Sequence, residues 1–273
     1  MSFLFILSTP FSGSTILWQL VGSSPHASSL PAEGQHMDSV REVMRGRHWD
    51  PDYEIPWERV RLEWEKEWDS SKEFLLEKSP PNLLRAAAIQ EHFEPAYFIG
   101  MIRNPYAFCE GVARRPDNDM DVASAAEFWL QCAQAQTRNK AELDHILFFT
   151  YEEFAEDPAA IRDRILEFLP ELECLDLDEP SDHSFMGHEP IIRNLNPIQI
   201  RRLTSRDIAR INRVLRREPQ LMADFGYDFI EPSLAQTIGS LKAKASSYAL
   251  RAARFRGILP GPIVRRIEKL VLE

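Results

Sequence analysis

A short loop near the start of the chain carries the residue types that bind phosphate. The segment Ser8–Thr15 reads Ser-Thr-Pro-Phe-Ser-Gly-Ser-Thr and lies between an apolar run and a stretch of helical spacing. A strand-to-helix turn directs free backbone N–H groups and the positive end of the helix dipole at one point. Gly13 lets the backbone approach an anion closely, and the hydroxyls of Ser12, Ser14 and Thr15 add donors. The loop therefore predicts a phosphate site.

This loop differs from the GxxxxGK[ST] loop of kinases and ATPases. Ser8 stands where that pattern has its first glycine, and Ser14 stands where it has its lysine. Without the lysine, and without an evident carboxylate for Mg²⁺, hydrolysis of a nucleoside triphosphate is disfavoured. A P-loop nucleotide kinase is kept as an alternative function.

An arginine follows another apolar run. The segment Ile99–Tyr106 reads Ile-Gly-Met-Ile-Arg-Asn-Pro-Tyr, so Arg103 ends a predicted strand and a helix begins at the proline; Arg114 and Arg115 follow. An arginine fork at this point can bind a second phosphate in bidentate fashion, at a nucleotide's length from the first loop. Together the two motifs fit a nucleotide.

The spacing of apolar residues predicts the frame that positions these motifs. We expect strands at residues 3–7, 74–77, 96–102 and 146–150, and helices from about Ile16 and at 57–69, 81–92, 121–141, 161–169, 205–216 and 218–224. Residues 23–37 are predicted to be irregular, and so is the stretch that follows the helix at 161–169 and extends to about residue 203. Strands alternating with helices indicate an α/β fold of three layers, a central parallel sheet with helices on both faces. Trp57, Trp64 and Trp68 form a stripe that favours core packing, with an acceptor lid or a dimer face as the alternatives.

Charge is distributed unevenly along the chain. The net charge is −10, but from Lys242 onward eight Lys and Arg stand against two Glu, so residues 1–241 carry −16. An acidic body repels nucleic acid and sulfated glycans. The shift in composition predicts a main domain at residues 1–232 and a basic helical appendage at residues 233–273. A solvated appendage, a surface-binding helix pair and a contact in a homodimer all remain open for the appendage.

The cysteines and the N-terminal segment exclude several protein classes. Cys109, Cys132 and Cys174 are far apart and form no CxxC pair, which argues against a disulfide framework and a cysteine-built zinc site. We expect no metal. The apolar run at residues 3–7 is too short for a signal peptide or a spanning helix. The sequence thus predicts a cytoplasmic protein without a transmembrane segment.

The two phosphate motifs resemble those of the sulfotransferase superfamily. Its members use a PxSG[ST] loop for the 5′-phosphosulfate of 3′-phosphoadenosine 5′-phosphosulfate (PAPS) and an R-[DN]-P block for the 3′-phosphate. The segments 149–158, 193–196 and 225–227 also resemble family blocks, so the resemblance covers roughly residues 3–228. It implies a P-loop-like sulfotransferase fold. It also implies cofactor contacts from Phe11, Ser12, Gly13, Ser14, Thr15, Arg103, Arg115, Tyr151 and Arg193.

Within the superfamily the chain is similar to the tyrosylprotein branch and its bacterial relatives. The segment Ala32-Glu33-Gly34 resembles the loop that carries that branch's glutamate base, and Glu77-Lys-Ser-Pro80 resembles its lysine-bearing strand end. Arg115 follows Arg103 by twelve residues, like the branch's second 3′-phosphate arginine. The resemblance implies that Glu33 is the general base and Lys78 the catalytic cation. His36 and His48 are alternative bases.

Two positions depart from the family pattern. Phe11 stands where members usually have Lys or Arg, and Gly111 where they usually have Ser. A catalytically inactive nucleotide-binding relative is therefore a second alternative.

The expected function is transfer of the sulfuryl group from PAPS to a hydroxyl or amine of a small-molecule acceptor, by in-line displacement and with PAP as product. The acidic body favours a neutral or cationic acceptor, and we expect a role in secondary metabolism.

Overall fold

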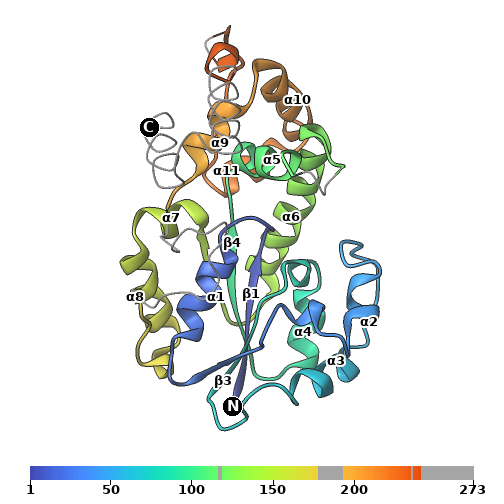
Figure 1. Cartoon of the computed structure of the whole chain (residues 1–273), viewed down its shortest axis with the longest axis vertical. Helices are drawn as coiled ribbons and strands as arrows, with labels where there is room; N and C mark the ends of the chain where they lie inside the picture. Colours follow the sequence, from blue (N-terminus) through green and yellow to red (C-terminus); the bar gives the residue numbers. More distant parts are fainter. Residues whose placement is uncertain (116–118, 178–192, 235, 241–273) are drawn as a thin grey trace, which may run out of the picture. The chain divides into compact units, whose positions relative to one another are not determined.

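The computed structural model describes residues 1–115, 119–177, 193–234 and 236–240 of the chain (Figure 1). These residues belong to two compact units. The first comprises residues 1–103 and 131–194, and the second residues 104–130 and 195–273. Most of the appendage predicted at residues 233–273 lies outside the described residues, so that part of the domain division stays a prediction.

The first unit is built on five parallel strands in the order β2-β3-β1-β4-β5. Their bounds are β1 Ser2–Ser8, β2 Ala27–Ser29, β3 Phe74–Glu77, β4 Ala96–Ile102 and β5 Ile146–Thr150. The last three coincide with the predicted strands, and β1 is one residue longer at each end. The strand β2 was not predicted, because Ala-Ser-Ser shows no apolar alternation. It forms because the sheet edge at β3 pairs with it, Ala27 opposite Phe74 and Ser29 opposite Leu76.

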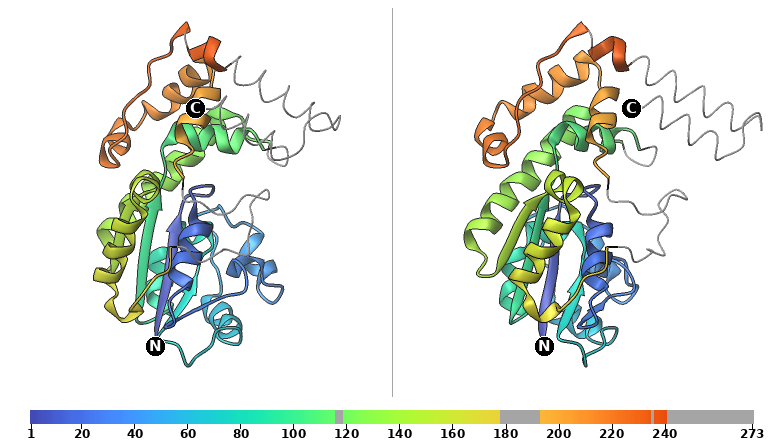
Figure 2. Two further views of the ribbon diagram at one scale, coloured as in Figure 1. Left: turned by 60° about the vertical axis from the view of Figure 1, so that its left-hand side comes forward. Right: turned by 90° about the vertical axis from the view of Figure 1, so that its left-hand side faces the viewer.

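Helices lie on both faces of this sheet (Figures 1 and 2). The side chains of Leu4 and Ile6 face a core shared with α1, α7 and α8. Phe3 and Phe5 point to the opposite face, where their rings lie 5.1 Å from that of Phe93. Because side chains alternate along a strand, β1 supplies both cores. The predicted three-layer α/β fold with a parallel sheet is confirmed.

The helical segments of the first unit are short. They are α1 Ser14–Gly22, η1 Gly34–His36, α2 Arg41–Arg45, α3 Trp57–Trp64, η2 Pro80–Leu84, α4 Ala86–His92, α7 Tyr151–Glu156, α8 Pro158–Phe168 and η3 Pro170–Leu172. The helix α6 (Val122–Glu142) contributes residues to both units. The prediction missed η1, α2 and α7, and it began α8 three residues late.

Two predicted helices differ from the observed ones. The helix predicted at residues 57–69 ends at Trp64, although Trp57, Trp64 and Trp68 are all buried, as core packing requires. The helix predicted at residues 81–92 is broken at Arg85, between η2 and α4. The Arg85 guanidinium donates hydrogen bonds to the carbonyls of His48 (2.8 Å) and Tyr53 (3.1 Å). These contacts with a distant loop are not visible in local spacing.

The second unit is helical. It contains α5 Pro105–Ala113, the first part of α6, α9 Asn196–Arg202, α10 Ser205–Leu215 and α11 Pro219–Asp224. The helix α9 lies in the stretch that was predicted to be irregular. It packs on α5 at Gly111, where an added Cβ would stand 2.8 Å from Gln199 Nε2. A serine at position 111 would therefore require Gln199 to move, which gives a physical reason for the glycine.

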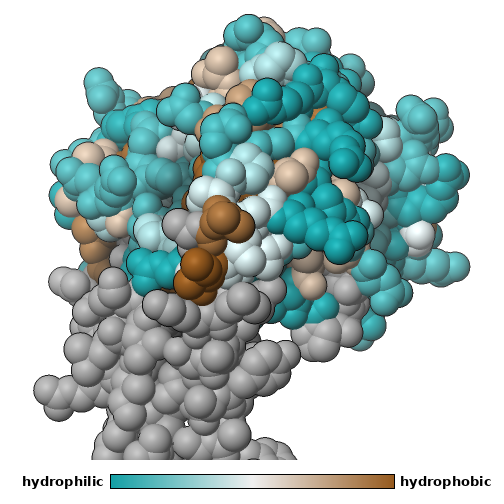
Figure 3. All heavy atoms as spheres, turned by 90° about the horizontal axis from the view of Figure 1, so that it is seen from above, coloured by the Kyte–Doolittle hydropathy of each residue, from teal (hydrophilic) through white to brown (hydrophobic). Residues whose placement is uncertain are grey.

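The surface seen in Figure 3 is largely hydrophilic, with one small apolar cluster. Exposed large apolar side chains of the second unit are those of Met120, Leu195, Leu234 and Ile238. Within the described ranges, no helix is both long and apolar enough to cross a membrane.

Candidate active site

The loop after β1 has the backbone shape of an anion site. Phe11 and Gly13 both have positive φ, 60° and 78°, and Gly13 is the N-cap of α1. Gly13 supplies no side-chain cap, and the start of a helix is a favourable place for an anion. The left-handed conformation costs a residue with a side chain roughly 1 kcal/mol or more. Strain of this kind at Phe11 is typical of a functional loop.

Each of the five strands is followed by residues that the sequence singled out. The loop with Gly13 follows β1, Glu33 follows β2, Lys78 follows β3, Arg103 follows β4, and Tyr151 follows β5. Because all strands are parallel, their carboxyl ends lie at one edge of the sheet. Ligands of open α/β sheets bind at this edge, where the strand order changes direction. Here that change lies at β1, whose neighbours are β3 and β4.

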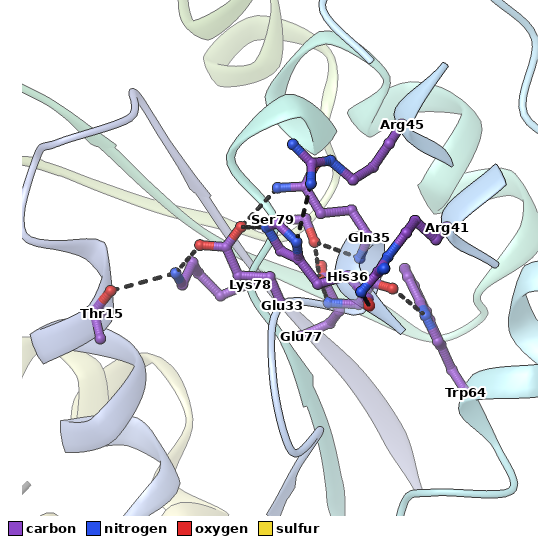
Figure 4. Close-up of polar contacts among 11 residues, drawn as sticks. Thr15, Glu33, Gln35, His36, Arg41, Arg45, Trp64, Glu77, Lys78 and Ser79 are labelled. Carbon is purple, nitrogen blue, oxygen red and sulfur yellow. Dashed lines mark hydrogen bonds and ion pairs between the residues drawn. The ribbon is translucent and has the colours of Figure 1, made fainter. Parts of the chain in front are cut away.

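Lys78 joins the predicted base to the loop (Figure 4). Its Nζ lies 2.5 Å from Glu33 Oε1 and 3.4 Å from Thr15 Oγ1. The Lys78 side chain is 5% exposed and that of Glu33 is 26% exposed. A largely buried ammonium needs a partner, and the Glu33 carboxylate supplies it. The structure thus brings Lys78, Glu33 and Thr15 together.

The other oxygen of Glu33 contacts two neighbouring side chains. Gln35 Nε2 donates to Glu33 Oε2 over 2.6 Å, and His36 Nε2 lies 3.4 Å from the same oxygen. Burial lowers the pKa of His36 from its ordinary value. The Glu33 carboxylate opposes this shift, and three nearby cations add to it: Arg45, Arg41 and Lys78. His36 is therefore neutral at neutral pH and lies beside Glu33.

His48 is differently placed. Its Nδ1 lies 2.8 Å from the Arg45 carbonyl oxygen, which makes Nδ1–H the donor. No hydrogen bond or ion pair joins His48 to Glu33 or Lys78 in the part of the chain that the structure describes. Of the two alternative bases, only His36 contacts the Glu33 carboxylate.

Arg103 packs between the loop and an aromatic ring. Its Nη1 donates to the Phe11 carbonyl over 2.7 Å, and its Cζ lies 4.1 Å from the centre of the Tyr151 ring. Tyr151 covers Gly13, where an added Cβ would stand 3.1 Å from the ring, and its hydroxyl donates to the Arg193 carbonyl over 2.6 Å. The structure therefore assembles Arg103, Tyr151 and the Arg193 backbone around the loop. The hydrogen bond from the Arg103 side chain to the Phe11 carbonyl helps to hold the loop.

Arg115 belongs to the second unit. It follows α5, and its backbone N–H donates to the Val112 carbonyl over 3.2 Å. Its predicted contact with a 3′-phosphate stays a prediction.

The site also contains residues that sequence reasoning did not select. Glu77, the last residue of β3, is fully buried, and its carboxylate accepts hydrogen bonds from Gly34, Ser79 and Asn82. The signal in the sequence was a carboxylate ending the otherwise apolar strand Phe-Leu-Leu-Glu. Among the described residues, no group of three or more His, Cys, Asp and Glu side chains is arranged to hold a metal ion.

Comparisons with known proteins identify a family and a fold. Residues 4–174 match the model of the family described as the sulfotransferase family. The fold is similar to the sulfotransferase domain from the olefin synthase of Synechococcus PCC 7002, with a TM-score of 0.52 and 20% identity over 84% of this chain and 96% of that one. It is also similar to the sulfotransferase domain from the curacin biosynthetic pathway, with a TM-score of 0.54 and 16% identity over 84% and 99% of the two chains. No curated protein sequence matches the chain.

Proposed function

The chain belongs to the sulfotransferase family, and we propose that it transfers the sulfuryl group of PAPS to a hydroxyl or amine of a small-molecule acceptor by in-line displacement. The observation that carries the proposal is the Lys78–Glu33 ion pair, 2.5 Å long, beside Thr15 of the loop. Sulfuryl transfer requires a cation for the leaving oxygen and a base for the acceptor, next to an anion site. We assign these three roles to Lys78, Glu33 and the loop.

The residues of the loop fit the 5′ end of PAPS. Two positive φ angles fold the loop, Gly13 allows the left-handed turn beneath the Tyr151 ring, and the hydroxyls of Ser14 and Thr15 are donors. When bound, PAPS supplies an activated sulfuryl group on a phosphate leaving group. We assign the contacts with PAPS to Phe11 (through its backbone), Ser12, Gly13, Ser14, Thr15, Arg103, Arg115, Tyr151 and Arg193.

Lys78 is assigned the role of the catalytic cation. Phe11 occupies the loop position where family members usually have a cation, whereas the Lys78 ammonium lies 3.4 Å from the Thr15 hydroxyl. In a largely buried site, an ammonium stabilises developing negative charge more strongly than it does in water. A sulfonate carries less charge than a phosphoryl group, so this cation and the loop amides suffice without a metal.

Glu33 is assigned the role of the base. Its carboxylate is partly exposed, so an acceptor can reach it, and the neighbouring Gln35 and His36 limit its movement. The Lys78 ammonium, 2.5 Å from Glu33 Oε1, holds the carboxylate beside the loop.

The acceptor is proposed to be neutral or cationic, because residues 1–241 carry a net charge of −16. Kinship with the tyrosylprotein branch and a role in secondary metabolism are parts of the same proposal.

The test is an acceptor screen. The chain is incubated with isotopically labelled PAPS and a panel of alcohols, phenols and amines of each charge, and mass spectrometry detects the labelled sulfuryl group on an acceptor. We expect a labelled product from a neutral or cationic acceptor, none with Glu33→Gln, and an unchanged yield with Lys66→Ala, whose lysine is exposed. Binding of PAP without any product would favour the inactive relative. Binding of ATP in preference to PAP would favour the kinase.

A further inference from the structure

Glu77 forms a clamp on the loop that carries Glu33 (Figure 4). Its Oε1 accepts a hydrogen bond from the Gly34 N–H over 2.9 Å and from the Ser79 hydroxyl over 2.5 Å. Its Oε2 accepts from Asn82 Nδ2 over 2.7 Å. The Ser79 oxygen in turn accepts from the Gln35 N–H over 3.1 Å. Two consecutive amides of the loop are therefore bound, directly or through Ser79, to one carboxylate.

The environment of Glu77 is costly for a carboxylate. The side chain is 0% exposed, and none of its hydrogen bonds comes from a lysine or an arginine. Burial raises the pKa of Glu77 to about 7; the bonds from Ser79 and Gly34 oppose the shift, Glu33 adds to it, and Lys78 opposes it. An apolar side chain would end a buried strand at lower cost. The carboxylate therefore has a task other than stability.

Gly34 is held on its other side by a tryptophan. Trp64 Nε1 donates to the Gly34 carbonyl over 3.4 Å, and an added Cβ at Gly34 would stand 2.5 Å from the Trp64 ring. The Gly34 peptide is thus fixed between the Glu77 carboxylate and the Trp64 indole. Glu33 and Gly34 are consecutive in the loop, and Glu77 and Lys78 are consecutive at the end of β3. Glu77 binds Gly34, and Lys78 binds Glu33.

We propose that Glu77 is a positioning residue, which fixes the Gly34–Gln35 backbone so that the Glu33 carboxylate stays within reach of Lys78. This inference rests on the proposed function, because it gives Glu77 a task only if Glu33 is the base. The charged groups that act on Glu77 are Lys78 and Glu33, the two residues with proposed catalytic roles. The neighbours on η2 and α3, Asn82 and Trp64, are neutral.

The variant Glu77→Gln tests the clamp. It keeps the shape, turns the acceptor toward Asn82 into an N–H donor, and leaves a neutral amide oxygen, a weaker acceptor than a carboxylate, for Gly34 and Ser79. Hydrogen–deuterium exchange, read by mass spectrometry on a peptide containing Gly34 and Gln35, needs no acceptor. We expect exchange at least about tenfold faster in Glu77→Gln than in the wild type. Glu73→Gln, the same change at the exposed residue just before β3, is the control and should leave the exchange rate unchanged.

Turnover of the acceptor found in the screen tests the consequence. Glu77→Gln should lower kcat by about tenfold or more and change PAP affinity by less than about twofold. In a chain that already carries Glu33→Gln, adding Glu77→Gln should lower kcat further by less than about twofold. Asn82→Asp in the Glu77→Gln chain restores a donor–acceptor match and should recover part of the rate. If Glu77→Gln does not fold, Ser79→Ala removes only the link to Gln35 and should show the same changes on a smaller scale.

The outcomes distinguish a failure of the clamp, of the positioning role and of the base assignment. Unchanged exchange of the loop peptide in Glu77→Gln, or in Ser79→Ala if only that variant folds, overturns the clamp. A loss from Glu77→Gln that is equally large in the Glu33→Gln background overturns the positioning role and leaves the proposed function intact. Full activity of Glu33→Gln itself overturns the base assignment, and the positioning role with it.

Discussion

Lys78 and Glu33 form an ion pair whose Nζ–Oε1 distance is 2.5 Å, and the same ammonium lies 3.4 Å from the Thr15 hydroxyl. The two residues come from different strand ends, β3 and β2, that are adjacent at the edge of the sheet. The pair places a cation and a carboxylate side by side next to the loop.

The first prediction concerns Lys78. The variant Lys78→Ala should lower turnover by roughly a hundredfold or more, because it removes the cation assigned to the leaving oxygen. Its affinity for PAP, measured by calorimetry, should change by less than a few-fold. Lys66→Ala, at an exposed position on the chain, is the matched control. Survival of turnover in Lys78→Ala would mean that the loop amides or another cation act on the leaving oxygen.

The second prediction concerns Arg103. The variant Arg103→Ala should weaken PAP binding by at least about tenfold, since charge-assisted hydrogen bonds contribute roughly 1.5–3 kcal/mol. Its bond to the Phe11 carbonyl adds a second effect, because the loop loses a support. Arg162→Ala on α8 is the control, a partly exposed arginine paired with Asp163. Calorimetry that finds equal PAP affinity in the wild type and in Arg103→Ala would remove Arg103 from the binding site.

The third prediction separates the two bases that contact each other. Glu33→Gln keeps the shape and removes the basicity, so turnover should fall by about 10²–10⁴-fold and the acid limb of the rate–pH profile should disappear. His36→Ala should cost far less, because burial lowers the pKa of His36, which makes it a weaker proton acceptor, and Arg45 already donates to its Nδ1. Calorimetry should find PAP affinity unchanged in both variants. Loss of activity in His36→Ala but not in Glu33→Gln would make the histidine the base.

Local patterns in the sequence predicted the strands that run through the core. Phe74–Glu77, Ala96–Ile102 and Ile146–Thr150 are short apolar runs between helical segments, and both their type and their bounds were right. A capping box at Thr150 and Glu153 was a readable signal for α7 that the prediction overlooked. By contrast, β2 forms only because β3 pairs with it.

The candidate site was predictable in its parts but not in its connections. Resemblance to a family pointed to Glu33 and Lys78 separately, and the structure adds that they form an ion pair. Neither the Glu77 clamp nor the Arg85 contacts could be read from spacing, because the loop residues that they bind are 32 to 44 residues away in the chain. Contacts of this range depend on the folded sheet.

The fourth prediction concerns stability and pH, and it follows from Glu77. Burial raises the pKa of Glu77 from 4.5 to about 7. Between these values the folded chain keeps a proton that the unfolded chain has lost, so the free energy of unfolding falls as pH rises, by up to about 3 kcal/mol. Glu77→Gln cannot titrate. Urea denaturation at pH 5 and pH 8 gives the free energy of unfolding of the wild type and of Glu77→Gln. The value for the wild type minus the value for Glu77→Gln should therefore be larger at pH 5 than at pH 8. Other groups cancel in this difference, including His36, whose lowered pKa acts in the opposite direction. A difference that is the same at both pH values would show that Glu77 is already ionised at pH 5.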